Sequence, residues 1–166
     1  MAVEVGTHEE ALPEDAEAMQ PTRRIRFRTG PLVDAQAALA LLTTPQRLPR
    51  LHPLITRVEE LPVRVEGTVR IADFTVHEGV PLLGGLVKWP NSYRGRVALD
   101  ASKPGTARLS GWSAPGVRVE TRYVVLDGVL EETAWISAPW WVDPFVYRTF
   151  VEAHRRLLEA VAVTPA

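Results

Sequence analysis

The sequence predicts an α+β domain in which a curved antiparallel β-sheet wraps around a long C-terminal α-helix. Three observations support this prediction. Residues 55–137 consist mostly of short segments in which apolar and polar residues alternate, the period of half-buried strands. The pair Asp127-Gly128 between two such segments is typical of a two-residue hairpin turn. From Asp143 to Val161 the apolar residues recur instead with a helical period.

Length and composition indicate one domain without covalent or metal staples. A chain of 166 residues can bury an adequate core by itself. Cys is absent, and the four His residues are too widely spaced for a zinc motif, so we expect neither a metal nor a cofactor. No apolar run reaches the roughly 18 residues of a membrane span, and the first residues lack a signal-peptide pattern. We therefore expect a cytoplasmic protein.

Charge separates the first residues from the rest of the chain. Residues 1–20 contain six acidic residues, no Lys or Arg and no hydrophobic period. We expect residues 1–20 to be an acidic, flexible tail and residues 21–163 to form the domain. In the remainder the Arg residues alternate along strands rather than cluster, which does not indicate nucleic-acid binding.

One strand and two short helices are expected at the start of the domain. Residues 22–29 alternate Arg with apolar residues, as a half-buried strand does. Asp34 can cap a helix over residues 35–42. Thr44 can cap a second short helix that starts at Pro45.

The middle of the chain has strand character. The expected strands are residues 55–61, 63–76, 92–99, 106–112, 117–126 and 129–137. In the second of them the apolar phase shifts near Ala72-Asp73, which indicates a β-bulge. Residues 78–91 are rich in Gly and Pro and are interpreted as a mobile loop or a broken strand, in which Trp89 would cover a cavity mouth.

The last hairpin can be assigned a register from its turn. The Asp127-Gly128 loop pairs Tyr123 with Glu132 and Thr121 with Ala134. Most residues on this face are apolar, so we expect the face to point inward. Tyr123, Thr121 and Glu132 share this face and are therefore expected to point inward too.

The final helix brings further residues to that face. Asp143 is the expected cap and Pro144 the first helical residue. The inward stripe of the helix contains Tyr147, Phe150 and His154.

Glu132 and His154 are predicted to lie at a similar depth. Each is roughly 16 Å from the corner where the last strand gives way to the helix. We therefore predict a polar cluster of Tyr123, Glu132 and His154, because a buried carboxylate needs a partner. Such a pair can act as acid and base on a carbonyl or an enol. In the alternative interpretation, Glu132 reaches water at the sheet rim and His154 is a core histidine with one hydrogen bond.

The tryptophans have structural interpretations. Trp140 and Trp141 are expected to pin the corner between strand and helix. Trp112 and Trp135 fall on the nominal outer face, where they would cover a sheet surface or a partner, so a homodimer is considered.

The order of elements resembles the START-like superfamily, also called SRPBCC or Bet v 1-like. The residues that carry the resemblance are LPRLHPLITRVEEL, from Leu48 to Leu61, and the hairpin and helix from Val117 to Val161. The first of these stretches resembles polyketide cyclase/dehydrase-type members. The resemblance implies a helix-grip fold with an apolar cavity between sheet and helix.

Three functions follow as alternatives. The favoured one is a protein that holds or carries a hydrophobic molecule such as a lipid, a quinone or a polyketide-like compound. The second is a cyclase or dehydratase-type enzyme with Glu132 and His154 as its acid–base pair. The third is a protein-interaction module of co-chaperone or subunit type. The candidate ligand-binding residues are Trp89, Thr121, Tyr123, Glu132, Tyr147, Phe150 and His154.

Overall fold

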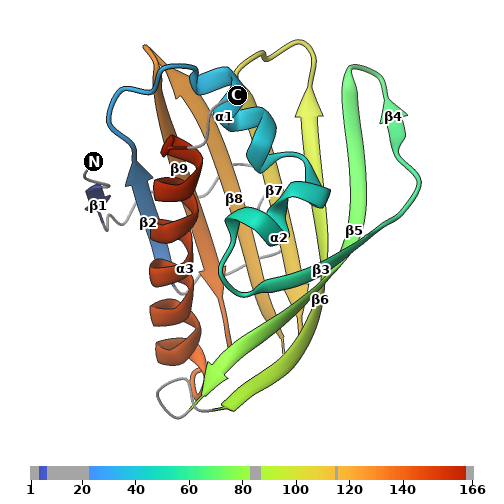
Figure 1. The fold of residues 1–166 in the computed structure, drawn as a ribbon. Helices are drawn as coiled ribbons and strands as arrows, with labels where there is room; N and C mark the ends of the chain where they lie inside the picture. Colours follow the sequence, from blue (N-terminus) through green and yellow to red (C-terminus); the bar gives the residue numbers. More distant parts are fainter. Residues whose placement is uncertain (1–3, 7–22, 83–86, 115, 164–166) are drawn as a thin grey trace.

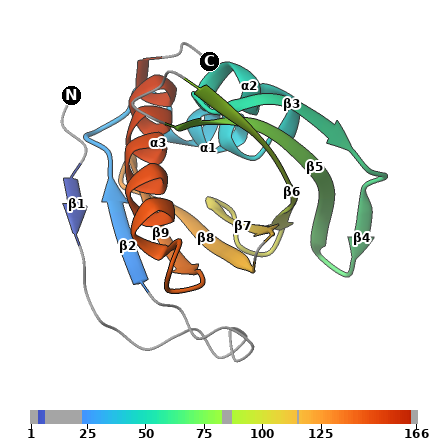
Figure 2. The same cartoon turned by 90° about the horizontal axis from the view of Figure 1, so that it is seen from below.

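The computed structural model describes residues 4–6, 23–82, 87–114 and 116–163 and has the predicted α+β architecture (Figure 1). One antiparallel sheet curves around the helix α3, and the short helices α1 and α2 lie at the open side of that curve (Figure 2). The strands are β1 (Glu4–Gly6), β2 (Arg23–Arg28), β3 (Ile55–Glu60), β4 (Arg64–Glu66), β5 (Val69–Leu82), β6 (Val87–Asp100), β7 (Thr106–Ser113), β8 (Val117–Leu126) and β9 (Val129–Ser137). The helices are α1 (Ala35–Leu42), the 3-10 turn η2 (Pro45–Arg47), α2 (Leu48–Leu51) and α3 (Asp143–Val163).

The sheet joins the two ends of the domain. Among the described residues it has nine strands, eight of them in the order β1-β2-β9-β8-β7-β6-β5-β3, while β4 pairs with β5. The first strand of the domain, β2, is therefore the neighbour of the last one, β9. This closure places α3, which follows β9 directly, across the concave face.

The β8–β9 hairpin has the predicted register. Tyr123 pairs with Glu132 and Thr121 with Ala134. Asp127 (φ 49°) and Gly128 (φ 74°) both have positive φ, as the favoured two-residue hairpin turn requires. The inward face is confirmed, because the side chains of Tyr123 and Glu132 are fully buried.

The first helices form as predicted, with one different contact. The side chain of Asp34 accepts a hydrogen bond from the backbone N–H of Ala37, so the predicted cap of α1 is confirmed. Thr44 lies at the N-cap position of the next segment and Pro45 is its first residue, as predicted, but the Thr44 side chain makes no capping hydrogen bond. Its hydroxyl donates to the carbonyl of Ala40 at 2.7 Å and so satisfies the end of α1.

Helix α3 is tied to the sheet at its first residue. Asp143 was expected to cap the helix, but its Oδ2 accepts two hydrogen bonds from Arg23, at 2.9 and 2.8 Å from Nε and Nη2. Its other oxygen has no hydrogen-bond partner among the described residues. The cap prediction is therefore wrong, although a carboxylate in the first turn still complements the helix dipole.

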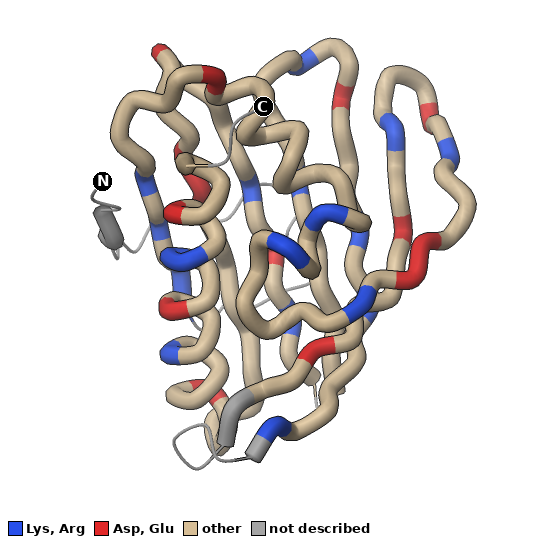
Figure 3. The backbone as a smooth tube through the Cα atoms, viewed as in Figure 1, with Lys and Arg blue, Asp and Glu red and all other residues tan. Residues whose placement is uncertain are grey.

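The apolar side of α3 forms the main core. Its buried residues are Ala153, Leu157, Leu158 and Val161. The last three pack in one cluster with residues of β2, α1, β8 and β9 that include Ile25, Phe27, Leu39, Leu42, Tyr123, Leu130 and Ile136. Further along α3 the charged residues are at least partly exposed, and Figure 3 shows where they fall along the helix. Among them, Arg155 pairs with Glu152 and Glu159 at 3.1 Å each. Exposed pairs of this kind contribute little to stability.

The strand predicted over residues 63–76 is wrong. The chain turns at Gly67 (φ 60°), and β4 pairs back on β5. The predicted bulge at Ala72-Asp73 is also wrong, because β5 pairs with β6 in an unbroken register there. The apolar phase shifts because Ile71 and Ala72, on opposite faces of the strand, are both buried.

The mobile loop or broken strand predicted over residues 78–91 is wrong for the described residues of that segment. β5 extends to Leu82 and β6 begins at Val87, and the two strands pair up to these residues. Pro90 is tolerated because it lies beyond the pairing of β6 with β7, which begins at Tyr93, and so interrupts no ladder on that side. The Gly and Pro residues of this segment favour a loop, and for that reason the sequence pattern does not predict these strand ends.

Two further predictions concern the ends and the outer face. Glu4–Gly6 pairs with β2 as an edge strand, whereas residues 1–3 and 7–22 lie outside the described part of the chain, so the flexible tail over residues 1–20 stays a prediction. Trp135 is 8% exposed and has the guanidinium of Arg24 at 5.6 Å from its ring centroid, so it is not an exposed partner site. The homodimer stays a prediction.

The corner before α3 is not pinned by its tryptophans. Trp140 is 85% and Trp141 59% exposed, so the expected packing role is wrong for both.

Among the described residues, no helix has the length and apolar character needed to cross a membrane.

Candidate functional site

A cavity of about 380 Å³ lies between α3 and the concave face of the sheet. Its apolar lining includes Leu48, Leu54, Phe74, Val80, Leu109, Val117, Val119, Val146 and Phe150. Two exposed lining residues, Trp89 and Phe145, come from the starts of β6 and α3. Both starts lie at the lower end of the molecule in Figure 1, so the cavity opens there.

The contact between Glu132 and His154 lies at the inner side of this cavity. His154 Nδ1 is 2.5 Å from Glu132 Oε1, and the carboxylate is completely buried. Since an ionised carboxylate can only accept, Nδ1 is the donor. His154 Nε2 is then the acceptor nitrogen of the neutral ring, and it has no hydrogen-bond partner among the described residues. Because His154 lines the cavity, this nitrogen is available to a ligand.

Aromatic rings hold His154 in place. The ring of Phe150 stacks on it with centroids 3.7 Å apart, and the ring of His52 meets it edge-on at 5.7 Å. Behind it, the buried Tyr123 lies beside Glu132, and its pKa is raised well above the ordinary value by burial and by that carboxylate. The imidazole therefore sits in a fixed orientation between a buried acid and the open cavity.

His52 is a neutral neighbour of His154. Its Nδ1 accepts from the backbone N–H of Leu54 at 3.4 Å. Burial, and to a lesser degree the charge of His154, lower the pKa of His52 from 6.5 to about 3. His52 therefore stays uncharged at neutral pH.

The lowered pKa of His52 predicts a loss of stability in acid. The unfolded chain takes up a proton at His52 as the pH falls below 6.5, whereas the folded protein does so only near 3, so the free energy of unfolding decreases between these values. We expect a loss of about 2 kcal/mol from this residue between pH 8 and pH 5. Urea unfolding at a series of pH values measures it. H52Q, which cannot titrate, should lose less stability over this range, and an equal loss in both proteins would contradict the assignment.

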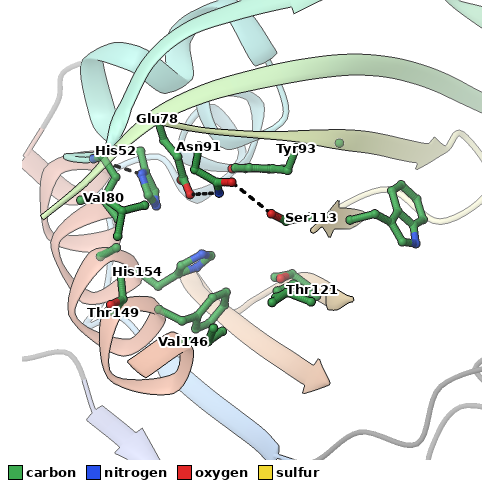
Figure 4. A pocket seen from close by; sticks show the side chains of 18 of the residues that line it. His52, Glu78, Val80, Asn91, Tyr93, Ser113, Thr121, Val146, Thr149 and His154 are labelled. Atoms are coloured by element: carbon green, nitrogen blue, oxygen red, sulfur yellow. Dashed lines mark hydrogen bonds between the residues drawn. The ribbon is translucent and has the colours of Figure 1, made fainter. Parts of the chain in front are cut away.

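A second polar group lies on the opposite wall, on β5, β6 and β7 (Figure 4). Asn91 Nδ2 donates to Glu78 Oε1 at 2.7 Å, and Ser113 Oγ donates to Asn91 Oδ1 at 3.3 Å. Burial raises the pKa of Glu78, while the bond from Asn91 opposes the rise. Burial, assisted by the charge of Glu78, raises the pKa of Tyr93.

Sequence reasoning missed this second group, which is formed by Glu78, Asn91, Tyr93 and Ser113. Its first two members lie in the segment interpreted as a loop. Glu78 and Asn91 pair directly across the β5–β6 ladder. The alternation of Val76, Glu78 and Val80 was the available signal, because it continues the inward face of β5.

The predicted ligand-binding residues divide into three sets. Trp89, Thr121, Phe150 and His154 line the cavity. Tyr123 and Glu132 are buried behind it and touch it only through His154. Tyr147 lies apart, with the Arg23 guanidinium 4.4 Å from its ring centroid. The described residues contain no group of three or more His, Asp or Glu side chains that would hold a metal ion.

Solved structures with the same fold include enzymes and a lipid-transfer protein. The di-domain ARO/CYC StfQ from the steffimycin biosynthetic pathway has a TM-score of 0.56 and 14% identity, covering 82% of this chain and 42% of its own, so this chain spans less than half of that protein. The Zhui aromatase/cyclase from a Streptomyces species has a TM-score of 0.53 and 16% identity, covering 83% and 93%. The STAR-related lipid transfer protein from Xanthomonas axonopodis has a TM-score of 0.57 and 17% identity, covering 96% and 91%. No family model matches the chain, and its sequence has no significant match among curated proteins.

These structures show the fold of the chain. The chain has the helix-grip fold of the START-like, SRPBCC or Bet v 1-like proteins, as the resemblance predicted. At these identities the likeness concerns the fold alone. Any ligand or activity has to be argued from the cavity.

Proposed function

We propose that this protein binds a hydrophobic small molecule in the cavity between α3 and the sheet. The observation that carries the proposal is the cavity itself, with its volume of about 380 Å³ and its mostly apolar lining. Small-molecule sites are typically concave and apolar with a few polar groups that orient the ligand. Here the polar groups form two sets, one around His154 and one around Glu78. A lipid, a quinone or a polyketide-like compound fits this description.

Filling the cavity with a larger side chain should weaken the binding of an apolar ligand strongly without unfolding the protein. Val119 lines the cavity, whereas its neighbour Arg118 is exposed on the other face of β8. We expect V119F to weaken the binding of the apolar dye anilinonaphthalene sulfonate by roughly tenfold or more, about 1.4 kcal/mol or above. The matched control R118F adds the same side chain outside and should bind as the unsubstituted protein does. Fluorescence titration measures both, and equal affinities for both variants would place the dye elsewhere.

The second candidate function is an enzyme that uses an acid–base pair. The specific observation in its favour is the 2.5 Å contact between Glu132 Oε1 and Nδ1 of His154, a residue that lines the cavity. A carboxylate that holds one ring nitrogen of a histidine makes the other nitrogen a better base. The open cavity gives less support to a pure protein-interaction module, because that function requires no space for a ligand.

A conservative substitution separates binding from catalysis. E132Q keeps the shape of the side chain but removes the negative charge that supports a protonated His154. For an enzyme we expect ligand affinity to stay within about threefold, whereas turnover of that ligand falls by roughly 100-fold. Binding and turnover are measured on the same preparation. Turnover that survives in E132Q would remove the pair from the mechanism.

A further inference from the structure

We propose that the second polar group is a carbonyl-binding site that faces the base His154. The cavity would then select hydrophobic ketones with an acidic hydrogen on the carbon next to the carbonyl, and would transfer that hydrogen as a proton. This inference rests on the proposed binding function and adds a ligand class and a reaction to it.

The donor side is built by three strands. Ser113 holds the amide of Asn91, which in turn donates to one oxygen of Glu78. Among the described residues, the second oxygen of Glu78 and the hydroxyl of Tyr93 have no hydrogen-bond partner, although both side chains line the cavity. These two groups are thus positioned but unused, as a ligand site requires.

The chemical state of these two groups suits a ligand oxygen. No cation contacts Glu78 among the described residues, and burial raises the pKa of its carboxyl group. Burial also raises the pKa of the Tyr93 phenol, which therefore carries its proton at neutral pH. The O–H of Tyr93, with that of a protonated Glu78 on the same wall, can donate to a carbonyl oxygen and stabilise the negative charge that develops there.

The acceptor side is His154, on the opposite wall. Figure 4 shows Glu78, Asn91 and Tyr93 on one side of the pocket and His154 on the other. Its Nε2 has an open lone pair, and Glu132 behind it stabilises the ring when it becomes positively charged. The two walls thus differ in role, since one donates and the other accepts. Such separation of titratable groups is the pattern of an acid–base site.

The reaction is balanced without any co-reactant. The proton leaves the carbon next to the carbonyl and goes to His154 Nε2. The electron pair of the broken C–H bond becomes the C=C bond of an enolate, and the carbonyl oxygen takes the negative charge between Glu78 and Tyr93. If the proton on His154 is replaced by one from solvent before transfer back, the same carbon receives a solvent hydrogen. Transfer to a conjugated carbon instead moves the double bond.

The test uses 2-tetralone as substrate probe and 2-naphthol as a stable analogue of its enol. In deuterated buffer, NMR should show that the protein accelerates hydrogen exchange next to the carbonyl of 2-tetralone. We expect H154N to lower this acceleration by roughly 100-fold, and Y93F and E78M, which each remove one donor, by roughly tenfold each. S92A, which changes an exposed serine next to Tyr93 in sequence, is the control and should exchange as the unsubstituted protein does. Circular dichroism verifies that each variant is folded.

Binding separates this inference from the proposed function. 2-Naphthol should bind at least tenfold more tightly than 2-methoxynaphthalene, which has no hydroxyl, and Y93F with E78M should remove the difference. Equal binding of both compounds, with no exchange of 2-tetralone, would overturn the carbonyl site and leave the apolar binding function standing. If neither compound nor the apolar dye binds, the proposed function fails as well.

Discussion

Replacing His154 by phenylalanine should lower the free energy of unfolding by about 3–5 kcal/mol, because it leaves a buried carboxylate without its partner. Glu132 is completely buried, and its second oxygen already has no hydrogen-bond partner among the described residues. Phenylalanine matches the aromatic surroundings of the site, in which the Phe150 ring stacks on that of His154. The loss therefore measures the unpaired acid rather than a poorly filled space. Urea unfolding followed by circular dichroism gives the value.

A double variant isolates this effect. E132L removes the acid, so H154F in that background should cost no more than about 1 kcal/mol. The coupling between the two substitutions should then be at least about 2 kcal/mol. Additive losses, with H154F alone costing about 1 kcal/mol, would instead support the alternative in which His154 is an ordinary core histidine.

Placing a methyl group on Gly95 is the second substitution with a large expected effect. Gly95 pairs with Phe74 across the β5–β6 ladder, and the phenylalanine ring covers it. A Cβ at this position would lie 2.6 Å from Phe74 Cζ and closer still to Cε2. The ring has to move, and both residues line the cavity. We expect G95A to cost about 1–3 kcal/mol of stability and to weaken dye binding by intruding into the ligand space.

Gly111 provides the matched control on the next strand. It also lines the cavity, but a Cβ there would meet its nearest atom, Cε2 of Tyr93, at 3.7 Å, an ordinary contact. G111A should therefore change stability by less than about 0.5 kcal/mol and keep the affinity for the dye. Thermal unfolding and fluorescence titration measure both variants. Equal behaviour of G95A and G111A would show that the Phe74 ring does not determine the shape of the cavity.

Local patterns predicted the parts of the fold that depend on local chemistry. The Asp127-Gly128 turn determined the register of its hairpin, and that register placed Glu132 on the buried face. Helical periodicity placed His154 on the matching face of α3, so the contact between the two could be anticipated. In both cases one turn or one repeat specifies which side chains share a face.

The failed predictions involve residues whose partners are distant in sequence. Asp143 has the sequence pattern of a helix cap, but a long-range bond to Arg23 takes up its side chain. The Gly and Pro neighbours of Glu78 and Asn91 are common in loops and favour a loop interpretation. In the structure these two residues pair with each other across the β5–β6 ladder. Tyr147 belongs to the apolar stripe of the helix, but its ring packs against the guanidinium of Arg23 and does not line the cavity. Propensity is a weak guide wherever tertiary pairing decides.

The central claim is that the cavity is a binding site for a hydrophobic molecule. Native mass spectrometry of the purified protein tests it most directly, because a bound compound travels with the folded chain and is released on denaturation. We predict a folded species heavier than the chain, with the extra mass lost under denaturing conditions and strongly reduced in V119F. A folded protein with the mass of the bare chain, which also fails to bind the apolar dye, would contradict the claim.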